Sequence, residues 1–466
     1  MKNYILTLTV AIFSTFCNGQ SLNTKSISDK TDTLVAQYQE LGIFSGVVLI
    51  AENGKPFYHK AFGLADREKN IPNTLQTAFV IGSMNKTFTR TIILQLIDEK
   101  KVKFSDNMVS YLSGFHQPDA GKITIKQLLD HTSGFGDYHS PEFFDLPNDQ
   151  KNIQGILAII KNMELLFEPG TENEYSNAGY ILLGAIIEKV TGKSYAENVN
   201  ERIKKPLQLH SLVTQHIKNT PNRAIGYMKT IDGFEDNENV VFEPKSDGGC
   251  YATAADMMKF YRAYLYGNSL FSEKVKKEDG FFQRIKPIYQ EKGAGIPLAG
   301  GFNGANTVHL EMLADNISIV VFANMDEPVA ENIAFGIHKI VNGKEPSKPQ
   351  LPTILNVYKA YKENGIAYVK EHFETLTDNW FENDPKDLVL NNLGYNLLFK
   401  GQVDDALQIF KLNTELFPKI GNCWDSYGEV LLKKGQKEEA LEAYKKALEI
   451  NPNIPSAKKM VKELEN

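Results

Sequence analysis

At 466 residues the chain is too long for one ordinary hydrophobic core, so its length predicts two or three domains. Hydrophobic residues make up 42% of the chain and charged residues 23%, proportions that are typical of a soluble globular protein. The formal net charge is -6 and no basic face stands out, which argues against nucleic acid as a partner.

The first segment of the chain has the pattern of a secretory signal peptide, predicted to cover residues 1–19. Lys2 gives it a positive start, an apolar run follows, and the small Gly19 ends it. We therefore predict a periplasmic or secreted protein that keeps no transmembrane anchor after cleavage, because the run is too short to span a bilayer. A buried N-terminal helix is the alternative. Lipidation at Cys17 is not expected, because the bulky Phe16 precedes it.

Two cysteines remain beyond this segment, Cys250 and Cys423. They lie far apart in the sequence, and no CxxC pair or zinc-type spacing occurs. The sequence therefore predicts two separate buried thiols. It implies no metal site and no organic cofactor.

Residues 25–342 have the pattern of an α+β domain. The expected elements are a helix over 28–41, a β-hairpin at Asn53-Gly54, helices over 83–99 and 177–191, strands over 307–313 and 317–324, and a helix ending near Val341. The Asn-Gly pair predicts a tight turn, since both residues tolerate positive φ. Strands at both ends with helices between them predict an antiparallel sheet flanked by helices, in which the first and last strands meet.

Residues 343–352 are rich in Pro and Lys and predict a linker, beyond which residues 353–466 have an all-helical pattern. Five residues recur there with an offset of 34, a period similar to that of the tetratricopeptide repeat. They are Gly394, Gly401, Ala406, Phe410 and Pro418, which recur as Gly428, Gly435, Ala440, Tyr444 and Pro452. We predict two repeats over about 386–454, stacked on helices at 353–375 or on the preceding domain. They form either a groove for a protein partner or a structural cap.

A Ser-x-x-Lys tetrad, Ser83 to Lys86, begins one of the predicted helices. Residues i and i+3 share a helix face, so Lys86 can activate the Ser83 hydroxyl as a nucleophile. The tetrad alone is weak evidence, because Ser456 to Lys459 repeats it in the C-terminal tail, where an exposed helix face is expected. Ser83 instead follows an apolar stretch and lies at a junction into an apolar helix, which favours it as the functional serine.

Tyr175-Ser176-Asn177 is the second candidate element. A tyrosine hydroxyl can relay protons with Lys86, and the Asn177 amide can hold both the lysine and a substrate carbonyl. Tyr266-Gly267-Asn268 imitates the pattern, but its residues are typical of a helix end. Tyr175 lies in a turn-rich loop that leads into a helix, a common setting for functional side chains.

The sequence contains four characteristic stretches in a fixed order, and two of them include the residues just named. They are 81–86 (IGSMNK), 128–135 (LLDHTSGF), 167–184 (FEPGTENEYSNAGYILLG) and 248–256 (GGCYATAAD). Because of these four stretches, the segment from about residue 25 to residue 342 resembles the serine β-lactamase-related family. This family includes class C β-lactamases, D-alanyl-D-alanine carboxypeptidases, D-aminopeptidases and esterases. The resemblance implies that Ser83 is acylated, that Lys86 and Tyr175 share the acid–base work, and that Asn177 positions substrate. It further implies a structural role for His131.

The third motif of this family normally begins with Lys or His on a strand that lines the cleft. This sequence has Leu298 in that position instead. The matching residues are Leu298-Ala299-Gly300-Gly301. The resemblance implies that Gly300 and Gly301 contact substrate and that the Ser83 and Gly301 amides form an oxyanion hole. Leu298 has no charge with which to hold a substrate carboxylate.

These features together predict an exported serine hydrolase that forms an acyl-enzyme on a small or peptide-like ester or amide. The missing cation makes an esterase or peptidase a better interpretation than an efficient β-lactamase. The alternative is a catalytically weakened penicillin-binding-like scaffold that binds a ligand, or a partner through its repeats.

Overall fold

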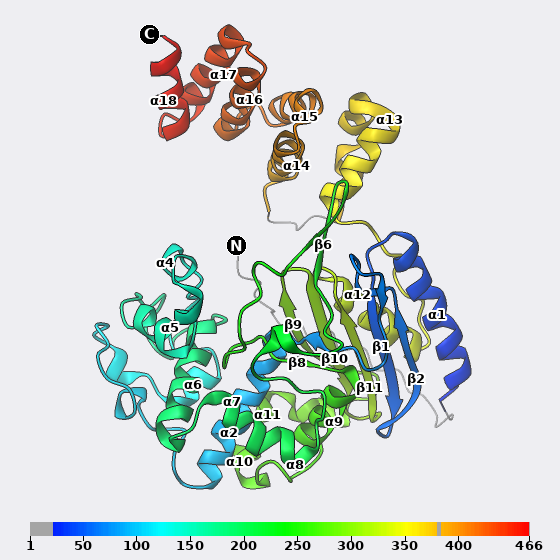
Figure 1. Ribbon diagram of the computed structural model, residues 1–466, viewed down its shortest axis with the longest axis vertical. Helices are drawn as coiled ribbons and strands as arrows, with labels where there is room; N and C mark the ends of the chain where they lie inside the picture. Colours follow the sequence, from blue (N-terminus) through cyan, green and yellow to red (C-terminus); the bar gives the residue numbers. More distant parts are fainter. Residues whose placement is uncertain (1–21, 380–383, 466) are drawn as a thin grey trace. The chain divides into compact units, whose positions relative to one another are not determined.

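The computed structural model describes residues 22–379 and 384–465 (Figure 1). The predicted signal peptide and Cys17 lie outside these residues. The chain forms two compact units and passes from the first to the second between Lys348 and Pro349, with Thr230–Gly233 grouped with the second. Among the helices of the described residues, none is long and apolar enough to cross a membrane.

The first unit is built on a five-stranded antiparallel sheet with the strand order β2-β1-β11-β10-β9. Its strands are β1 (Gly46–Glu52), β2 (Lys55–Phe62), β9 (Ile296–Phe302), β10 (Ala305–Met312) and β11 (Ile317–Ala323). β1 pairs with β11 so that Gly46 lies opposite Ala323, which confirms that the first and last strands of the sheet meet. Between β1 and β2, Asn53 and Gly54 both have positive φ, as the hairpin prediction requires.

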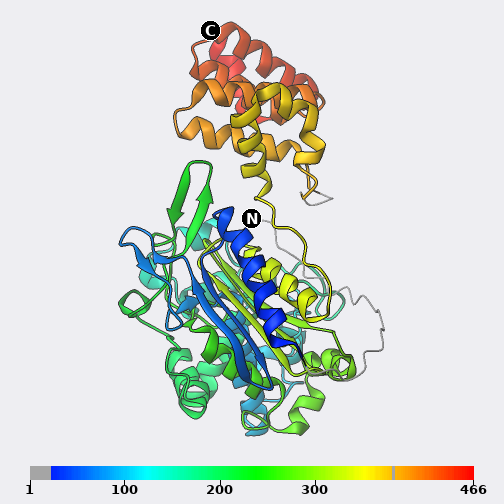
Figure 2. The same ribbon diagram turned by 90° about the vertical axis from the view of Figure 1, so that its right-hand side faces the viewer.

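Helices cover both faces of this sheet, with α1 and α12 side by side on one face (Figures 1 and 2). Because of this cover, β10 and β11 are buried at every position. The helices of the unit are α1 (Thr24–Glu40), α2 (Lys86–Asp98), α3 (Ile125–Leu129), α4 (Pro141–Phe144), α5 (Ile153–Ile160), α6 (Asn177–Thr191), α7 (Tyr195–Val199), α8 (Lys205–Leu207), α9 (Ala254–Leu265), α10 (Glu273–Glu278), α11 (Gly280–Ile285) and α12 (Val329–Val341).

Short strand pairs complete the unit: β3 (Leu64–Asp66) with β4 (Ile71–Pro72), β5 (Phe79–Val80) with β8 (Tyr251–Ala252), and β6 (Tyr227–Thr230) with β7 (Gly233–Asp236). The β5–β8 pair leads the chain directly into the turn that carries Ser83. At the centre of the core, α6 is buried at ten consecutive positions, 178–187. It ends at Gly192, whose left-handed conformation is the helix end that the sequence predicts.

The second unit contains helices only. They are α13 (Thr353–Leu376), α14 (Asp387–Phe399), α15 (Val403–Leu416), α16 (Gly421–Lys433), α17 (Lys437–Ile450) and α18 (Pro455–Leu464). α13 consists of two helical pieces that meet at Gly365, where φ is +81°. Val357 and Phe373 of α13 share one hydrophobic cluster with Leu393 and Phe410 of the first repeat, so the repeats pack on the helices at 353–375, one of the two predicted supports.

The recurring small residues of the repeats lie where paired helices touch. A Cβ built on Gly394 would lie 2.6 Å from the Phe410 ring, and one on Gly428 would lie 3.0 Å from the Tyr444 ring. Ala406 and Ala440 are fully buried. The 34-residue period therefore reflects a repeated close contact between a glycine and an aromatic ring.

Both described cysteines, Cys250 and Cys423, are buried and free, as predicted. Burial raises the pKa of each thiol, that of Cys423 to about 12. A protonated, buried thiol is a weak nucleophile, so neither cysteine competes with Ser83 as a reactive group.

Candidate active site

The turn that carries Ser83 is a short 3-10 helix, η1 (Gly82–Asn85), which α2 continues from Lys86. The predicted α-helix thus begins three residues later than expected. Gly82 has a φ of +49°, and a Cβ built there would lie 2.7 Å from the backbone nitrogen of Gly301. Glycine therefore allows η1 to lie against β9. Within the turn, Lys86 Nζ donates a hydrogen bond to Ser83 Oγ at 3.1 Å.

Ser83 Oγ also lies within reach of a second proton donor. The hydroxyl of Tyr175 donates to it at 2.7 Å. Lys86 Nζ donates further to Asn177 Oδ1 and to the backbone oxygen of Asp247, each at 2.7 Å. An ammonium group has three donors, and these contacts together with Ser83 use all three. The lysine is 6% exposed, so its amine is held in one place beside the nucleophile.

The loop that carries Tyr175 and Asn177 is fixed by the residue between them. Ser176 is the N-cap of α6, and its hydroxyl accepts a hydrogen bond from the Gly179 nitrogen at 2.8 Å. The same hydroxyl donates to the backbone oxygen of Gly136 at 3.1 Å. An N-cap with these two contacts sets the direction of both flanking side chains. Tyr175 consequently reaches Ser83 Oγ, and Asn177 reaches the Lys86 amine beside it.

The edge strand β9 closes the other side of the site. A Cβ on Gly300 would lie 2.8 Å from the Ser83 nitrogen, and one on Gly301 would overlap the carboxylate of Glu327. Gly300 therefore needs to be glycine for the strand to approach η1, whereas Gly301 leaves room for the Glu327 side chain. The backbone amides of Ser83 and Gly301 lie where η1 meets β9, the place in which an oxyanion hole is expected.

Leu298 lies two residues before Gly300, and alternate residues of a strand share one face. It pairs with His309 of β10 and packs, half-buried, against the main hydrophobic core. His309 is itself buried, with Nε2 2.7 Å from Oε2 of Glu311. The face of β9 that meets Ser83 thus presents an apolar side chain at position 298.

Two residues that sequence reasoning missed extend the site, Asp137 and His139. Asn177 Nδ2 donates to Asp137 Oδ1 at 3.0 Å, and His139 Nδ1 lies 2.6 Å from the same oxygen. Burial alone would raise the pKa of Asp137, but the hydrogen bonds from His139 and Asn177 outweigh it and hold the pKa below its ordinary value. Asp137 comes two residues after the LLDHTSGF stretch, a position that gives the only sequence signal for it.

Comparison with known proteins agrees with this geometry. The beta-lactamase family matches residues 31–338, and a tetratricopeptide repeat matches residues 421–454. The chain belongs to the beta-lactamase family. Members of this family share a fold of mixed helices and antiparallel sheet, so the predicted resemblance and fold class are both confirmed.

Individual relatives of this beta-lactamase family chain are moderately similar to it. Penicillin-binding protein 4* of Bacillus subtilis is 28% identical over 395 residues, which cover 76% of this chain and 86% of the relative. The teichoic acid D-alanine hydrolase of Staphylococcus aureus is 28% identical over 314 residues, covering 61% and 77%. The structure of a penicillin-binding protein from Bacillus halodurans matches with a TM-score of 0.57 and 26% identity, covering 66% of this chain and 98% of that one.

His131 of this family member supports the site from behind. Its Nδ1 accepts a hydrogen bond from the Ser176 nitrogen at 3.0 Å, and its ring stacks on Tyr175 with centroids 4.9 Å apart. Burial, followed by the charges of Lys86 and Arg90, lowers the pKa of His131 to about 3. The imidazole accepts a hydrogen bond from the backbone through Nδ1 and positions Tyr175 by stacking on its ring. These contacts fit a structural role.

His131→Asn is expected to flatten the dependence of stability on pH. The unfolded imidazole takes up a proton below a pH of about 6.5, whereas the folded one stays neutral to about 3, so stability falls as pH falls through this window. Each unit of pKa shift corresponds to about 1.4 kcal/mol, so several kcal/mol depend on this ring. Asparagine tolerates the φ of +60° at this position. Urea unfolding at several pH values checks the result, and parallel profiles for the two proteins would contradict it.

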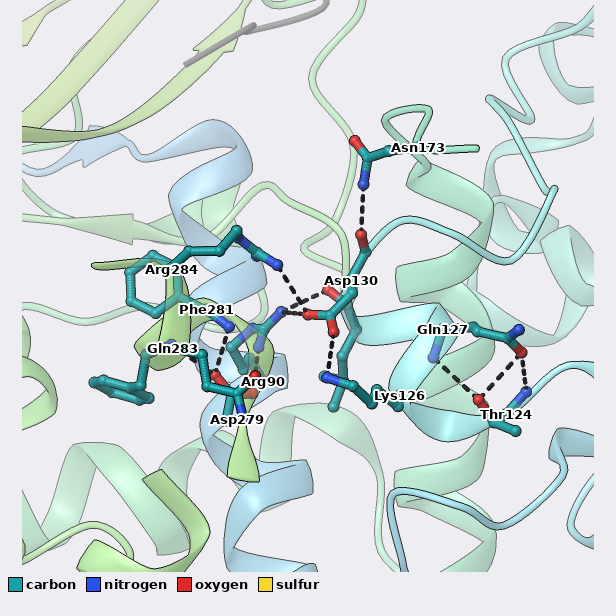
Figure 3. A network of polar contacts seen from close by, with 12 residues as sticks. Arg90, Thr124, Lys126, Gln127, Asp130, Asn173, Asp279, Phe281, Gln283 and Arg284 are labelled. Carbon is teal, nitrogen blue, oxygen red and sulfur yellow. Dashed lines mark hydrogen bonds and ion pairs between the residues drawn. The ribbon is translucent and has the colours of Figure 1, made fainter. Parts of the chain in front are cut away.

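A buried ion-pair network anchors α2 at Arg90, four residues after Lys86 (Figure 3). Arg90, 5% exposed, binds Asp279 through Nη1 and contacts Asp130 through Nη2 at 3.1 Å. Lys126 and Arg284 also contact Asp130, at 2.8 and 3.5 Å. The network ties α2, α3 and α11 together, directly beside the loop that begins at His131.

The two motifs that imitate the site residues lie in settings typical of helix surfaces and helix ends. Ser456 and Lys459 are exposed on α18 of the second unit, as expected for a solvated helix face. Tyr266 caps the end of α9, and its hydroxyl donates to Glu311 Oε1 at 2.8 Å.

Proposed function

We propose that the protein is an exported serine hydrolase that forms an acyl-enzyme at Ser83 with an ester or amide substrate. One observation carries this proposal: Ser83 Oγ has both Lys86 Nζ, at 3.1 Å, and the Tyr175 hydroxyl, at 2.7 Å, within hydrogen-bond reach. A serine hydroxyl needs such a neighbour to become a nucleophile. Membership of the beta-lactamase family supports the same reaction class.

In the proposed mechanism, Ser83 Oγ attacks the substrate carbonyl while its proton passes to the Lys86–Tyr175 pair. The Ser83 and Gly301 amides stabilise the oxyanion, and one such donor contributes roughly 3–4 kcal/mol to lowering the barrier. The tyrosine hydroxyl then delivers the proton to the leaving group. Water attacks the acyl-enzyme by the reverse proton path and frees Ser83. Asn177 holds the lysine in position through all of these steps.

Leu298 directs the proposal toward an esterase or peptidase. A leucine cannot pair with the carboxylate of a penicillin or of a peptide terminus. The teichoic acid D-alanine hydrolase among the relatives supports a D-alanyl compound as a model substrate. The signal-peptide pattern of residues 1–19 supports export to the periplasm or medium. A weakened scaffold is the second candidate, and Leu298 is the feature that favours it.

The repeats are proposed to bind a segment of a partner protein. Asn391 and Asp425 occupy equivalent positions of α14 and α16, 34 residues apart. Within the described chain, Oδ1 of each is buried and lacks a hydrogen-bond partner. Buried acceptors without donors are unusual, and a peptide whose N–H groups displaced the side chains that cover these oxygens would satisfy them.

Labelling with a fluorophosphonate probe tests the hydrolase proposal. The mature protein is expected to carry one adduct on Ser83, mapped by mass spectrometry, because the probe reacts with activated serines. Ser83→Ala should remain unlabelled, and Ser456→Ala should be labelled like the wild type. A wild-type protein without an adduct at Ser83 would favour the scaffold.

A further inference from the structure

We propose that the hydrogen bond between Tyr138 and Asp247 holds the Lys86 amine in place for catalysis. Both are positioning residues, because their side chains act through the lysine and not on the substrate. This inference rests on the proposed acyl-enzyme at Ser83, since it assigns part of the machinery that activates this serine.

The amine of Lys86 is only as well placed as the groups that accept its hydrogen bonds. A lysine ends in a point charge on a flexible four-carbon stem, so its position depends on its acceptors. Apart from Ser83, these are Asn177 Oδ1 and the backbone oxygen of Asp247, each at 2.7 Å. Asn177 begins α6, whereas Asp247 lies in the loop before β8. A tie between these two distant segments is therefore needed to fix both acceptors at once.

Two consecutive residues, Asp137 and Tyr138, supply this tie. Asp137 Oδ1 accepts a hydrogen bond from Asn177 Nδ2 at 3.0 Å. The Tyr138 hydroxyl donates to Asp247 Oδ2 at 2.8 Å. With the two bonds from Lys86, these contacts close a ring of hydrogen bonds that includes the lysine amine. Supporting contacts of this kind hold a catalytic group in its productive geometry.

The contact between Tyr138 and Asp247 is shielded from water. Tyr138 is 1% exposed and Asp247 is 6% exposed. Burial, followed by the charge of Asp247, raises the pKa of Tyr138 well above its usual value, so its hydroxyl stays a donor. Among the residues that the structure describes, none forms a hydrogen bond with the other carboxylate oxygen, Oδ1. A buried carboxylate with so little support is costly, and a role at the site accounts for that cost.

The loop of Asp247 is also held to the start of α2 without help from Tyr138. The backbone oxygens of residues 245–247 accept, in order, from Asn85 Nδ2 at 2.7 Å, Thr89 Oγ1 at 2.5 Å and Lys86 Nζ. Loss of the Tyr138 hydroxyl leaves the first two of these bonds in place and frees the residue that binds the lysine. The expected result is a displaced amine in a protein that still folds.

Tyr138→Phe tests the proposal, because it keeps the ring that stacks on His139 and meets Phe143 edge-on, and removes only the hydroxyl. The rate of Ser83 labelling by the fluorophosphonate is expected to fall about 10- to 100-fold, the cost of a small misplacement in an active site. Asp247→Leu should lose as much. Asp247→Asn should lose less, because its amide oxygen can still accept from Tyr138. Urea unfolding identifies any variant that fails to fold.

A double-mutant cycle with Lys86 distinguishes positioning from a purely structural role. In the Lys86→Met protein, adding Tyr138→Phe should cause no further loss of labelling rate, because the amine that the hydroxyl positions is gone. Equal losses in the two backgrounds would overturn the inference. A wild-type labelling rate in folded Tyr138→Phe, or in folded Asp247→Leu, would also overturn it.

Tyr58→Phe is the matched control. Tyr58 is 3% exposed and donates to Asp32 Oδ1 at 2.8 Å, the same kind of contact at the same length. It lies on β2, at the opposite edge of the sheet from β9, so its labelling rate should equal that of the wild type. A wild-type protein without an adduct on Ser83 would instead overturn the acyl-enzyme, and this inference with it.

Discussion

Lys86→Met is expected to lower kcat/KM for any ester substrate by about 100- to 10,000-fold, the usual contribution of a positioned acid–base group. Methionine fills a similar volume but cannot accept or donate the Ser83 proton. The change also leaves Asn177 Oδ1 and the backbone oxygen of Asp247 without the amine that each binds at 2.7 Å. Steady-state kinetics together with fluorophosphonate labelling rates measure the loss at Ser83.

The sequence offers a matched control for this variant. Lys459→Met makes the same substitution in the second Ser-x-x-Lys tetrad, on an exposed face of α18. Its kcat/KM should stay within experimental error of the wild type. Tyr175→Phe removes the other proton donor of Ser83 and leaves the buried amine in place, so a large loss in this variant comes from proton transfer and not from misfolding around the lysine. Equal activity in Lys86→Met and Lys459→Met would contradict the assigned role of Lys86.

Local patterns predict those parts of the fold that nearby residues specify. The turn at Asn53-Gly54 and the end of α6 at Gly192 depend on residues that tolerate positive φ, and both lie where the sequence places them. The short strands β5 and β8 escape such prediction, because their pairing joins distant segments of the chain. β5 pairs with β8, which begins at Tyr251.

The candidate site also contains some residues that local patterns predict and others that they do not. The spacing of Ser83 and Lys86 predicts their contact, since one turn of helix connects them. Tyr175 lies 92 residues from Ser83 in the sequence, so a family resemblance was needed to bring it to the site. Asp137 carried no recognisable motif, because its place in the site depends on a single amide, Asn177, that only the folded chain brings near it.

Removal of Arg90 is expected to destabilise the first unit strongly. Arg90→Met should lower the free energy of unfolding by about 3–5 kcal/mol, the cost of leaving the partners of a buried ion pair uncompensated. Asp279, 1% exposed, would lose its guanidinium partner, and Asp130 would keep only partly exposed cations. Burial disfavours the charge of Arg90, but Asp279 and nearby groups outweigh burial and raise its pKa, so the guanidinium stays charged throughout the measurement.

Arg284→Met separates burial from charge, because Arg284 contacts the same carboxylate, Asp130, at 3.5 Å but is 54% exposed. An exposed pair contributes about 0–1 kcal/mol, so this variant should unfold nearly like the wild type in urea. The loss in Arg90→Met should extend to catalysis, since α2 carries both Arg90 and Lys86 and the network holds that helix against Asp130 at the end of α3 (Figure 3). Similar unfolding free energies for the two arginine variants would show that the network does not stabilise the catalytic helix.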